Sequence, residues 1–270
     1  MHRSYLFVPA DRPDRFDKAW ASNADEVIID LEYAVADDRK AFARANAQRW
    51  MSPAHPVLVR VNASKTEWHL DDLGLLEHPG LRGLMLPKAE SLDESLVQHC
   101  KVHGKHIIPI VETAVGFHCA GMLAGTPCVE RLAFGALDFK LDLGIDGDDD
   151  ALLVFRSHLV LISRLAGIQP PLDGVTVEVG DAEVLRVDTQ RSKRLGFGGK
   201  LCIHPCQIET VNQAFSPTAV EILWAREIIE TLERSGGAAV TVAGKMVDQP
   251  ILRKAKQILN GIRQRTANQQ

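Results

Sequence analysis

The sequence lacks a long apolar run and a strong excess of either charge. None of its apolar stretches approaches the ~20 residues that a membrane-spanning helix requires, so we expect no membrane association. The chain carries 31 lysines and arginines against 35 aspartates and glutamates, a net charge of −4. This mildly acidic balance argues against nucleic acid as a partner. The apolar stretch at the N-terminus is too short for a signal peptide, and we expect a cytoplasmic protein.

Cysteine is scarce as well, with five residues in a chain of 270. Their odd number and irregular spacing do not suggest a disulfide framework. The segment CIHPC brings Cys202, His204 and Cys206 together, but a tetrahedral zinc site needs a fourth ligand, and no second paired motif is evident. We therefore expect buried thiols and no structural zinc.

The sequence does contain a regular alternation of apolar, β-branched runs with helix-length segments. Each run has the length and composition of a strand that is buried on both faces. Eight strand–helix units within residues 1–215 predict an α/β protein with a (β/α)₈ TIM barrel. The predicted strands are residues 3–10, 26–32, 57–62, 83–88, 106–112, 131–137, a part of 171–179, and 200–204.

Residues 216–270 follow the predicted barrel as an appendix. An amphipathic helix over 218–235, a hairpin within 238–250 and a final helix over 251–262 are expected, with a frayed tail after them. Because the barrel is complete without this segment, its apolar faces must be buried elsewhere. We expect it to serve as a lid and oligomerisation segment in a homo-oligomer, most simply a trimer or a multiple of one.

Charged residues stand at the ends of successive apolar runs. They are Glu32, Arg60, Lys88 with Glu90, Glu112 and Asp138. The carboxyl ends of all strands in a parallel barrel meet at one face, so these side chains should converge there. Any one of them alone could equally be a strand-end residue that reaches water. Five in register favour a functional site.

The residue types at this face indicate a chemistry. Glu112 and Asp138 end neighbouring strands, which lie about 4.8 Å apart, and could share one Mg²⁺ with open positions left for substrate. Arg60 could hold a substrate carboxylate through two hydrogen bonds, or instead form a salt bridge across the barrel mouth with Glu32. Backbone N–H groups from Gly135 to Asp138 could hold a carboxylate as well.

Eight segments together resemble a known family. They are RSYLFVPA, DLEYAV, LVRVN, LPKAE, IVETAVG, FGALDFKLDLG, GKLCIHPCQI and GKMVDQP, in that order between residues 3 and 250. The sequence is similar to the β subunit of citrate lyase and its relatives, the citrate lyase/malyl-CoA lyase branch of the HpcH/HpaI aldolase superfamily. The resemblance implies a (β/α)₈ barrel that binds Mg²⁺.

The resemblance also implies roles for individual residues. Glu112 and Asp138 would bind the metal, and Arg60 would contact substrate and take part in catalysis. Asp248 would act as acid or base in a neighbouring subunit's site. The remaining substrate-binding residues on this hypothesis are Lys88, Glu32, Gly135, Ala136 and Leu137.

The predicted activity is a Mg²⁺-dependent carbon–carbon lyase that cleaves a β-hydroxyacyl thioester of the citryl-, malyl- or citramalyl-CoA type by retro-Claisen chemistry. The thioester could be carried by CoA or by an acyl carrier. Two alternatives stay open: a class II-type aldolase on a free 2-oxo acid, and a subunit that is inactive without partner chains. One departure bears on the substrate, because relatives commonly read LEDAV where this chain reads LEYAV, with Tyr33 in place of an acidic residue.

Overall fold

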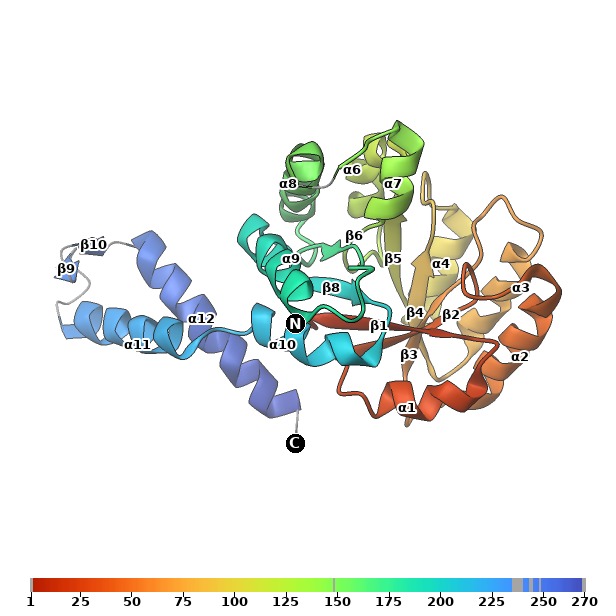
Figure 1. Cartoon of the computed structure of the whole chain (residues 1–270), viewed down its shortest axis with the longest axis horizontal. Coiled ribbons are helices and arrows are strands. Elements are labelled where there is room, and N and C mark those ends of the chain that lie inside the picture. Colours follow the sequence, from red (N-terminus) through yellow and green to blue (C-terminus); the bar gives the residue numbers. More distant parts are fainter. Residues whose placement is uncertain (1, 148, 235–239, 243–244, 248, 269–270) are drawn as a thin grey trace. The chain divides into compact units, whose positions relative to one another are not determined.

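The computed structural model of the chain describes residues 2–147, 149–234, 240–242, 245–247 and 249–268. These residues belong to two compact units, His2–Phe215 and Ser216–Gln270. The first unit is a closed barrel of parallel strands, with each strand paired to its neighbour in chain order and β8 paired to β1. Helices surround the strands (Figure 1). The predicted TIM barrel is confirmed.

The strands and helices alternate along the first unit. The strands are β1 (Ser4–Pro9), β2 (Glu26–Asp30), β3 (Val57–Arg60), β4 (Leu81–Leu86), β5 (His106–Val111), β6 (Ala133–Phe134), β7 (Leu172–Asp173) and β8 (Gly199–Cys202). The α-helices are α1 (Phe16–Trp20), α2 (Lys40–Trp50), α3 (His69–Leu73), α4 (Glu94–Val102), α5 (Ala114–His118), α6 (Ala120–Gly125), α7 (Ala136–Leu143), α8 (Asp149–Leu165), α9 (Ala182–Leu195) and α10 (Ile208–Phe215). Short 3₁₀ turns are η1 (Pro13–Arg15), η2 (Asp37–Arg39), η3 (Gly74–Glu77) and η4 (Pro205–Gln207).

The apolar runs serve two cores. Side chains that alternate along each strand point to opposite faces of the sheet. One set fills the barrel interior, among them Ile28, Leu58 and Met85. The other set, including Ile29 and Leu84, packs against the helices. Both faces of each strand are therefore apolar, which explains why the runs show no polar alternation.

The sixth strand differs from the prediction. It has only two residues, Ala133 and Phe134, whereas residues 131–137 were expected to be extended. The chain turns at Gly135 and enters α7 at Ala136. Asp138 therefore lies in the first turn of a helix and not at the end of a strand, although it still lies at the carboxyl end of the barrel.

The second unit is a pair of helices with a small hairpin. Helix α11 (Ala219–Arg234) packs against α12 (Gln249–Asn268) through a core that includes Ala225, Ile228 and Ala255. Strands β9 (Val240–Val242) and β10 (Lys245–Val247) pair antiparallel. The last helix runs on to Asn268, so the frayed tail expected after residue 262 is wrong up to that point. No helix in the described part of the chain is long and apolar enough to cross a membrane.

Candidate active site at the barrel mouth

A cavity of about 340 Å³ opens at the carboxyl end of the barrel strands. Of the predicted site residues, Arg60, Glu112 and Gly135 to Asp138 line it. Glu32 and Lys88 lie beside the cavity and bond to residues that line it. Asp248 falls outside the described residues.

Glu112 is the more deeply buried of the two predicted metal ligands. It follows β5 directly and is only 3% exposed. Its Oε1 accepts a hydrogen bond of 2.7 Å from the backbone N–H of Lys88. Burial, together with the nearby carboxylates of Glu32 and Asp138, raises the pKa of Glu112 to about 8. A buried carboxyl group with two further carboxylates beside it is suited to an added cation.

Gly135 makes room for this carboxylate. A β-carbon built at residue 135 would lie 2.3 Å from Oε2 of Glu112, a distance that no side chain tolerates. The glycine therefore lets β6 and the Glu112 carboxylate approach closely. The same residue is the N-cap of α7, and the first backbone hydrogen bond of the helix runs from Phe139 N–H to the Gly135 carbonyl. The N–H groups that precede Phe139 have no acceptor within the helix and lie along the cavity wall.

Arg60 is fixed by carboxylates of the neighbouring strand. Its Nε and Nη2 donate to the two carboxylate oxygens of Asp30, each at 2.7 Å. Its Nη1 lies 3.2 Å from Oε2 of Glu32, although that oxygen accepts no well-aligned hydrogen bond. Burial opposes the charged form of Arg60, but Asp30 outweighs it and raises the pKa of the guanidinium further. Arg60 therefore forms a salt bridge with Glu32 at the mouth, as the alternative to substrate binding predicted. Its Nη1 is the guanidinium nitrogen with the weakest contacts.

Lys88 contacts Glu112 through its backbone and contacts Glu32 and Tyr33 through its side chain. Its backbone has a positive φ of 47°, which is uncommon for a residue with a side chain and turns its N–H toward Glu112. Its Nζ lies 3.3 Å from Oε1 of Glu32 and 2.6 Å from the hydroxyl of Tyr33. Burial lowers the pKa of Lys88, but the Tyr33 hydroxyl and Glu32 more than offset this and leave it raised. Lys88 is thus a cation throughout the neutral range.

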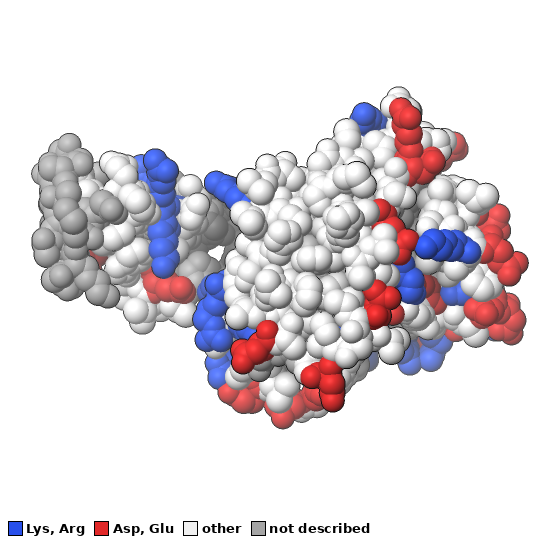
Figure 2. Space-filling view, turned by 90° about the horizontal axis from the view of Figure 1, so that it is seen from above, with Lys and Arg blue, Asp and Glu red and all other residues white. Residues whose placement is uncertain are grey.

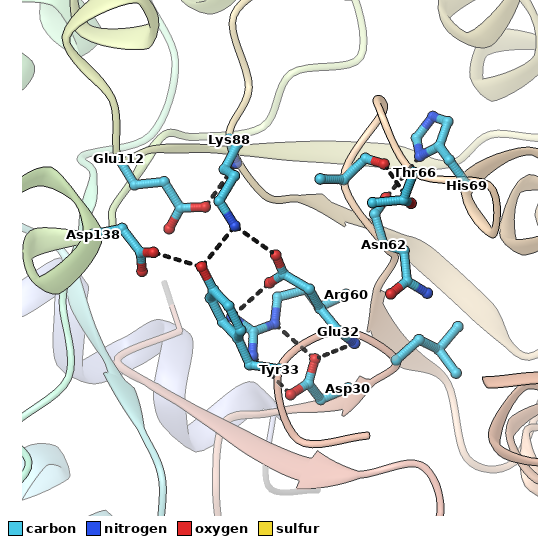
Figure 3. A network of polar contacts seen from close by, with 12 residues as sticks. Asp30, Glu32, Tyr33, Arg60, Asn62, Thr66, His69, Lys88, Glu112 and Asp138 are labelled. Carbon is cyan, nitrogen blue, oxygen red and sulfur yellow. Dashed lines mark hydrogen bonds and ion pairs between the residues drawn. The ribbon is translucent and has the colours of Figure 1, made fainter. Parts of the chain in front are cut away.

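Sequence reasoning missed Asp30 as a site residue, and it marked Tyr33 as a departure that bears on the substrate without predicting its contacts. Asp30 is 1% exposed and looked like one more residue of an apolar run, because only the barrel shows that Arg60 of β3 lies beside it. The Tyr33 hydroxyl donates to Oδ1 of Asp138 at 2.5 Å, from the opposite side of the mouth (Figure 3). An acidic residue inside a strand of apolar residues was the only available signal for Asp30.

The donor set at the mouth fits a hard divalent cation. Glu112 and Asp138 both face the cavity, and Mg²⁺ commonly takes one or two carboxylates while keeping water or substrate oxygens. The raised pKa of Glu112 reflects its burial and the two nearby carboxylates, which outweigh the opposing effects of the Lys88 N–H and of Arg60. These two residues would hold the ion.

Among the described residues, the three candidate ligands of the CIHPC segment are not close enough together to share a metal. The His204 Nδ1 lies 2.9 Å from Sγ of Cys206, whereas burial raises the pKa of the Cys202 thiol to about 12. Cys100 and Cys202 are buried, but Cys119 and Cys128 are only partly buried and Cys206 is exposed, so the expectation of buried thiols holds for two of the five. Within the described ranges, the one group of three side chains close enough to share a metal is Glu77, His99 and His103, on the outside of the barrel.

The model of the HpcH/HpaI aldolase/citrate lyase family matches residues 3–205. The chain belongs to this family. It is 35% identical to a citrate lyase subunit beta-like protein of Deinococcus radiodurans, over 96% of both chains. It is 31% identical to a (3S)-malyl-CoA thioesterase of Cereibacter sphaeroides, over 95% of this chain and 93% of that protein.

A solved structure supports the same relationship. The CitE protein of Mycobacterium tuberculosis, in complex with magnesium, acetoacetate and coenzyme A, superposes with a TM-score of 0.83 at 34% identity, over 96% of this chain and 97% of that one. The family thus contains proteins that bind magnesium, an oxo acid and CoA. Lyases and thioesterases both occur among the named relatives.

Proposed function

We propose that this protein is a Mg²⁺-dependent carbon–carbon lyase that cleaves a β-hydroxyacyl-CoA thioester into acetyl-CoA and a 2-oxo acid. One observation carries the proposal: two carboxylates, Glu112 and Asp138, share a cavity with free backbone donors of α7 and with Arg60. The citryl-, malyl- and citramalyl-CoA types all present the same group to this cavity, a carboxylate beside a hydroxylated carbon.

Different residues of the site would have different roles in the reaction. Glu112 and Asp138 would hold the magnesium ion, which when bound supplies a Lewis acid for the oxygens of an oxo acid or hydroxy acid. The N–H groups at the start of α7 and Nη1 of Arg60, which also lies near Glu32, would bind the substrate carboxylate. Lys88 holds positive charge beside this point and would favour the developing negative charge on oxygen.

Cleavage also needs a group that takes the hydroxyl proton, and we assign this role to Asp248 of a neighbouring subunit. The barrel unit carries exposed apolar side chains suited to an interface, including Leu141, Val154 and Leu165. The space-filling view likewise shows a broad face of the barrel unit with few charges (Figure 2). A homotrimer, or a multiple of one, in which residues 216–270 of one chain act as a lid over another chain's mouth fits these features.

Subunit exchange tests this arrangement. Asp248→Ala and Glu112→Ala each remove one half of a shared site, so a mixture of the two inactive variants should regain part of the activity after exchange. The controls are each variant exchanged with itself and labelled subunits that report that exchange has occurred. Exchange without recovered activity would place Asp248 in its own chain's site or in no site.

The reaction itself is tested with a panel of hydroxyacyl-CoA thioesters and Mg²⁺. A lyase releases acetyl-CoA and a 2-oxo acid, whereas a thioesterase releases free CoA and leaves the hydroxy acid intact. The relatives named malyl-CoA thioesterases make hydrolysis the second candidate. Free 2-oxo acids in the same panel test the aldolase alternative. Activity of the purified chain alone would exclude dependence on partner chains or an acyl carrier.

A further inference from the structure

The hydroxyl of Tyr33 lies between two charged groups at the barrel mouth. It donates a hydrogen bond of 2.5 Å to Oδ1 of Asp138 and accepts one of 2.6 Å from Nζ of Lys88. Tyr33 follows β2, Lys88 follows β4 and Asp138 opens α7 after β6. This one oxygen thus connects three separate parts of the barrel rim (Figure 3).

Asp138 depends on this contact. It is partly buried on the first turn of α7, and the Tyr33 hydroxyl is the only hydrogen-bond partner of its carboxylate within the described part of the chain. Without that bond the carboxylate could rotate freely about its side-chain torsions. Glu112, by contrast, is buried and held by the Lys88 N–H.

Tyr33 is itself held in place although 58% of it is exposed. The Lys88 ammonium lies 4.4 Å from the centre of its ring, and the Arg60 guanidinium lies 5.5 Å from it. Lys88 is tied in turn to Glu32, and Arg60 to Asp30. The ring therefore rests on cations that are anchored in the barrel, which restricts the position of its hydroxyl.

We infer that Tyr33 is a positioning residue that orients the Asp138 carboxylate for Mg²⁺. This inference rests on the proposed function, in which Glu112 and Asp138 hold the ion. A hydrogen bond to one oxygen of a ligating carboxylate leaves the other oxygen to face the cation, and loss of such an outer partner commonly costs about 10- to 100-fold in metal affinity. Tyr33 acts through Asp138 and touches neither the ion nor the reacting atoms.

The two tyrosines of the chain provide a matched pair for the experiment. Tyr33→Phe removes the hydroxyl at the mouth, and Tyr5→Phe removes the other one, which accepts a hydrogen bond from Arg131 at the opposite end of the barrel. Calorimetric titration with Mg²⁺ should show affinity reduced about tenfold or more in Tyr33→Phe and unchanged in Tyr5→Phe. Saturating Mg²⁺ should restore most of the turnover of Tyr33→Phe.

An unchanged Mg²⁺ affinity in Tyr33→Phe would overturn the inference, and so would turnover that saturating Mg²⁺ does not restore. The titration also includes Glu112→Gln, which should abolish binding. If the wild-type protein binds no Mg²⁺, or Glu112→Gln binds it normally, the proposed metal site fails. If both behave as expected and only Tyr33→Phe does not, the proposed site stands and the role of Tyr33 falls.

Discussion

Both ends of the barrel hold buried charged groups, but acidic and basic groups are equal in number at one end and unequal at the other. At the amino end of the strands, Arg131 is completely buried and donates to the carbonyls of Pro170 and His2 and to the Tyr5 hydroxyl. Arg82 bridges the carboxylates of Glu26 and Glu130 at 3.1 and 2.9 Å. The two arginines and the two glutamates match in number there.

At the carboxyl end the acidic groups outnumber the basic ones. Asp30, Glu32, Glu112 and Asp138 face Arg60 and Lys88 around an open cavity. The pKa values of Glu112 and Glu32 are both raised, chiefly by burial. Breaking a buried, paired network of charges destabilises a fold, whereas carboxylates with raised pKa values in a cleft are candidates for a functional site. On the proposed function, the difference between the two ends therefore separates a structural network from a functional one.

The largest effect should follow from removing a proposed metal ligand. We expect Glu112→Gln or Asp138→Asn to lower the Mg²⁺-dependent kcat/KM at least about 10³-fold, or ~4 kcal/mol, with the fold retained. Activity and circular dichroism of the same samples check this. Replacing the exposed Asp14, which pairs with Arg12 and does not line the cavity, provides the control. Wild-type activity in Glu112→Gln would remove the metal from the proposed mechanism.

A substitution at the amino end of the barrel should have the converse effect: it should lower stability and leave Mg²⁺ binding unchanged. Arg131→Met leaves two backbone carbonyls and the Tyr5 hydroxyl without a donor in a buried place. We expect a loss of about 3 kcal/mol in the free energy of unfolding, with the Mg²⁺ affinity unchanged. Urea denaturation and calorimetric titration measure the two quantities separately. A variant with normal stability and altered Mg²⁺ binding would contradict the division between the two ends.

The Glu112 carboxyl group at the mouth should also make the free energy of unfolding depend on pH. In the Mg²⁺-free protein, folded Glu112 keeps its proton up to a pKa of about 8, whereas an unfolded glutamate loses it near its ordinary value of 4.5. The folded state therefore binds more protons between these limits, and this contribution to stability is lost as the pH rises toward 8. Each unit of the difference corresponds to about 1.4 kcal/mol, so the fall should reach a few kcal/mol.

Denaturant unfolding in EDTA between pH 5.5 and 8.5 would measure that slope. Glu112→Gln should flatten it, because glutamine does not titrate. Excess Mg²⁺ should stabilise the protein most at the alkaline end, where Glu112 is ionised. A stability curve that has the same slope in Glu112→Gln as in the wild-type protein would show that Glu112 is not the group responsible.

The sequence predicts the barrel and most of its rim because both follow from local patterns. A run of apolar, β-branched residues predicts a strand, and the residue after it reaches the rim in any parallel barrel. Glu112 and Arg60 were found in this way. Asp138 was found although its strand is short, because Gly135 moves the start of α7 forward without moving the residue away from the mouth.

The contacts between rim residues could not be predicted in the same way. Tyr33 and Asp138 are 105 positions apart in sequence and meet across the mouth. Their contact depends on the barrel's curvature and on side-chain torsions, which periodicity does not encode. The positive φ of Lys88 is likewise set by its surroundings, since no glycine marks it. The sequence thus identified several members of the site, and the structure supplied the connections among them.

The smallest effect should come from a change that keeps the charge of the mouth. Arg60→Lys retains a cation but loses the planar group that donates to both oxygens of Asp30 and still presents Nη1 to the cavity. We expect kcat/KM to fall about 10- to 100-fold, or ~1.4–2.8 kcal/mol. Most of the loss should appear in KM if Nη1 binds the substrate carboxylate equally in the ground and transition states. Arg186→Lys, in an exposed pair with Glu183 on α9, is the matched control and should be neutral. Steady-state kinetics on a carboxylate-bearing thioester would measure the split. Unchanged constants for Arg60→Lys would mean that Arg60 serves only to neutralise Asp30 and Glu32, and the mouth would then hold one structural pair like those at the opposite end.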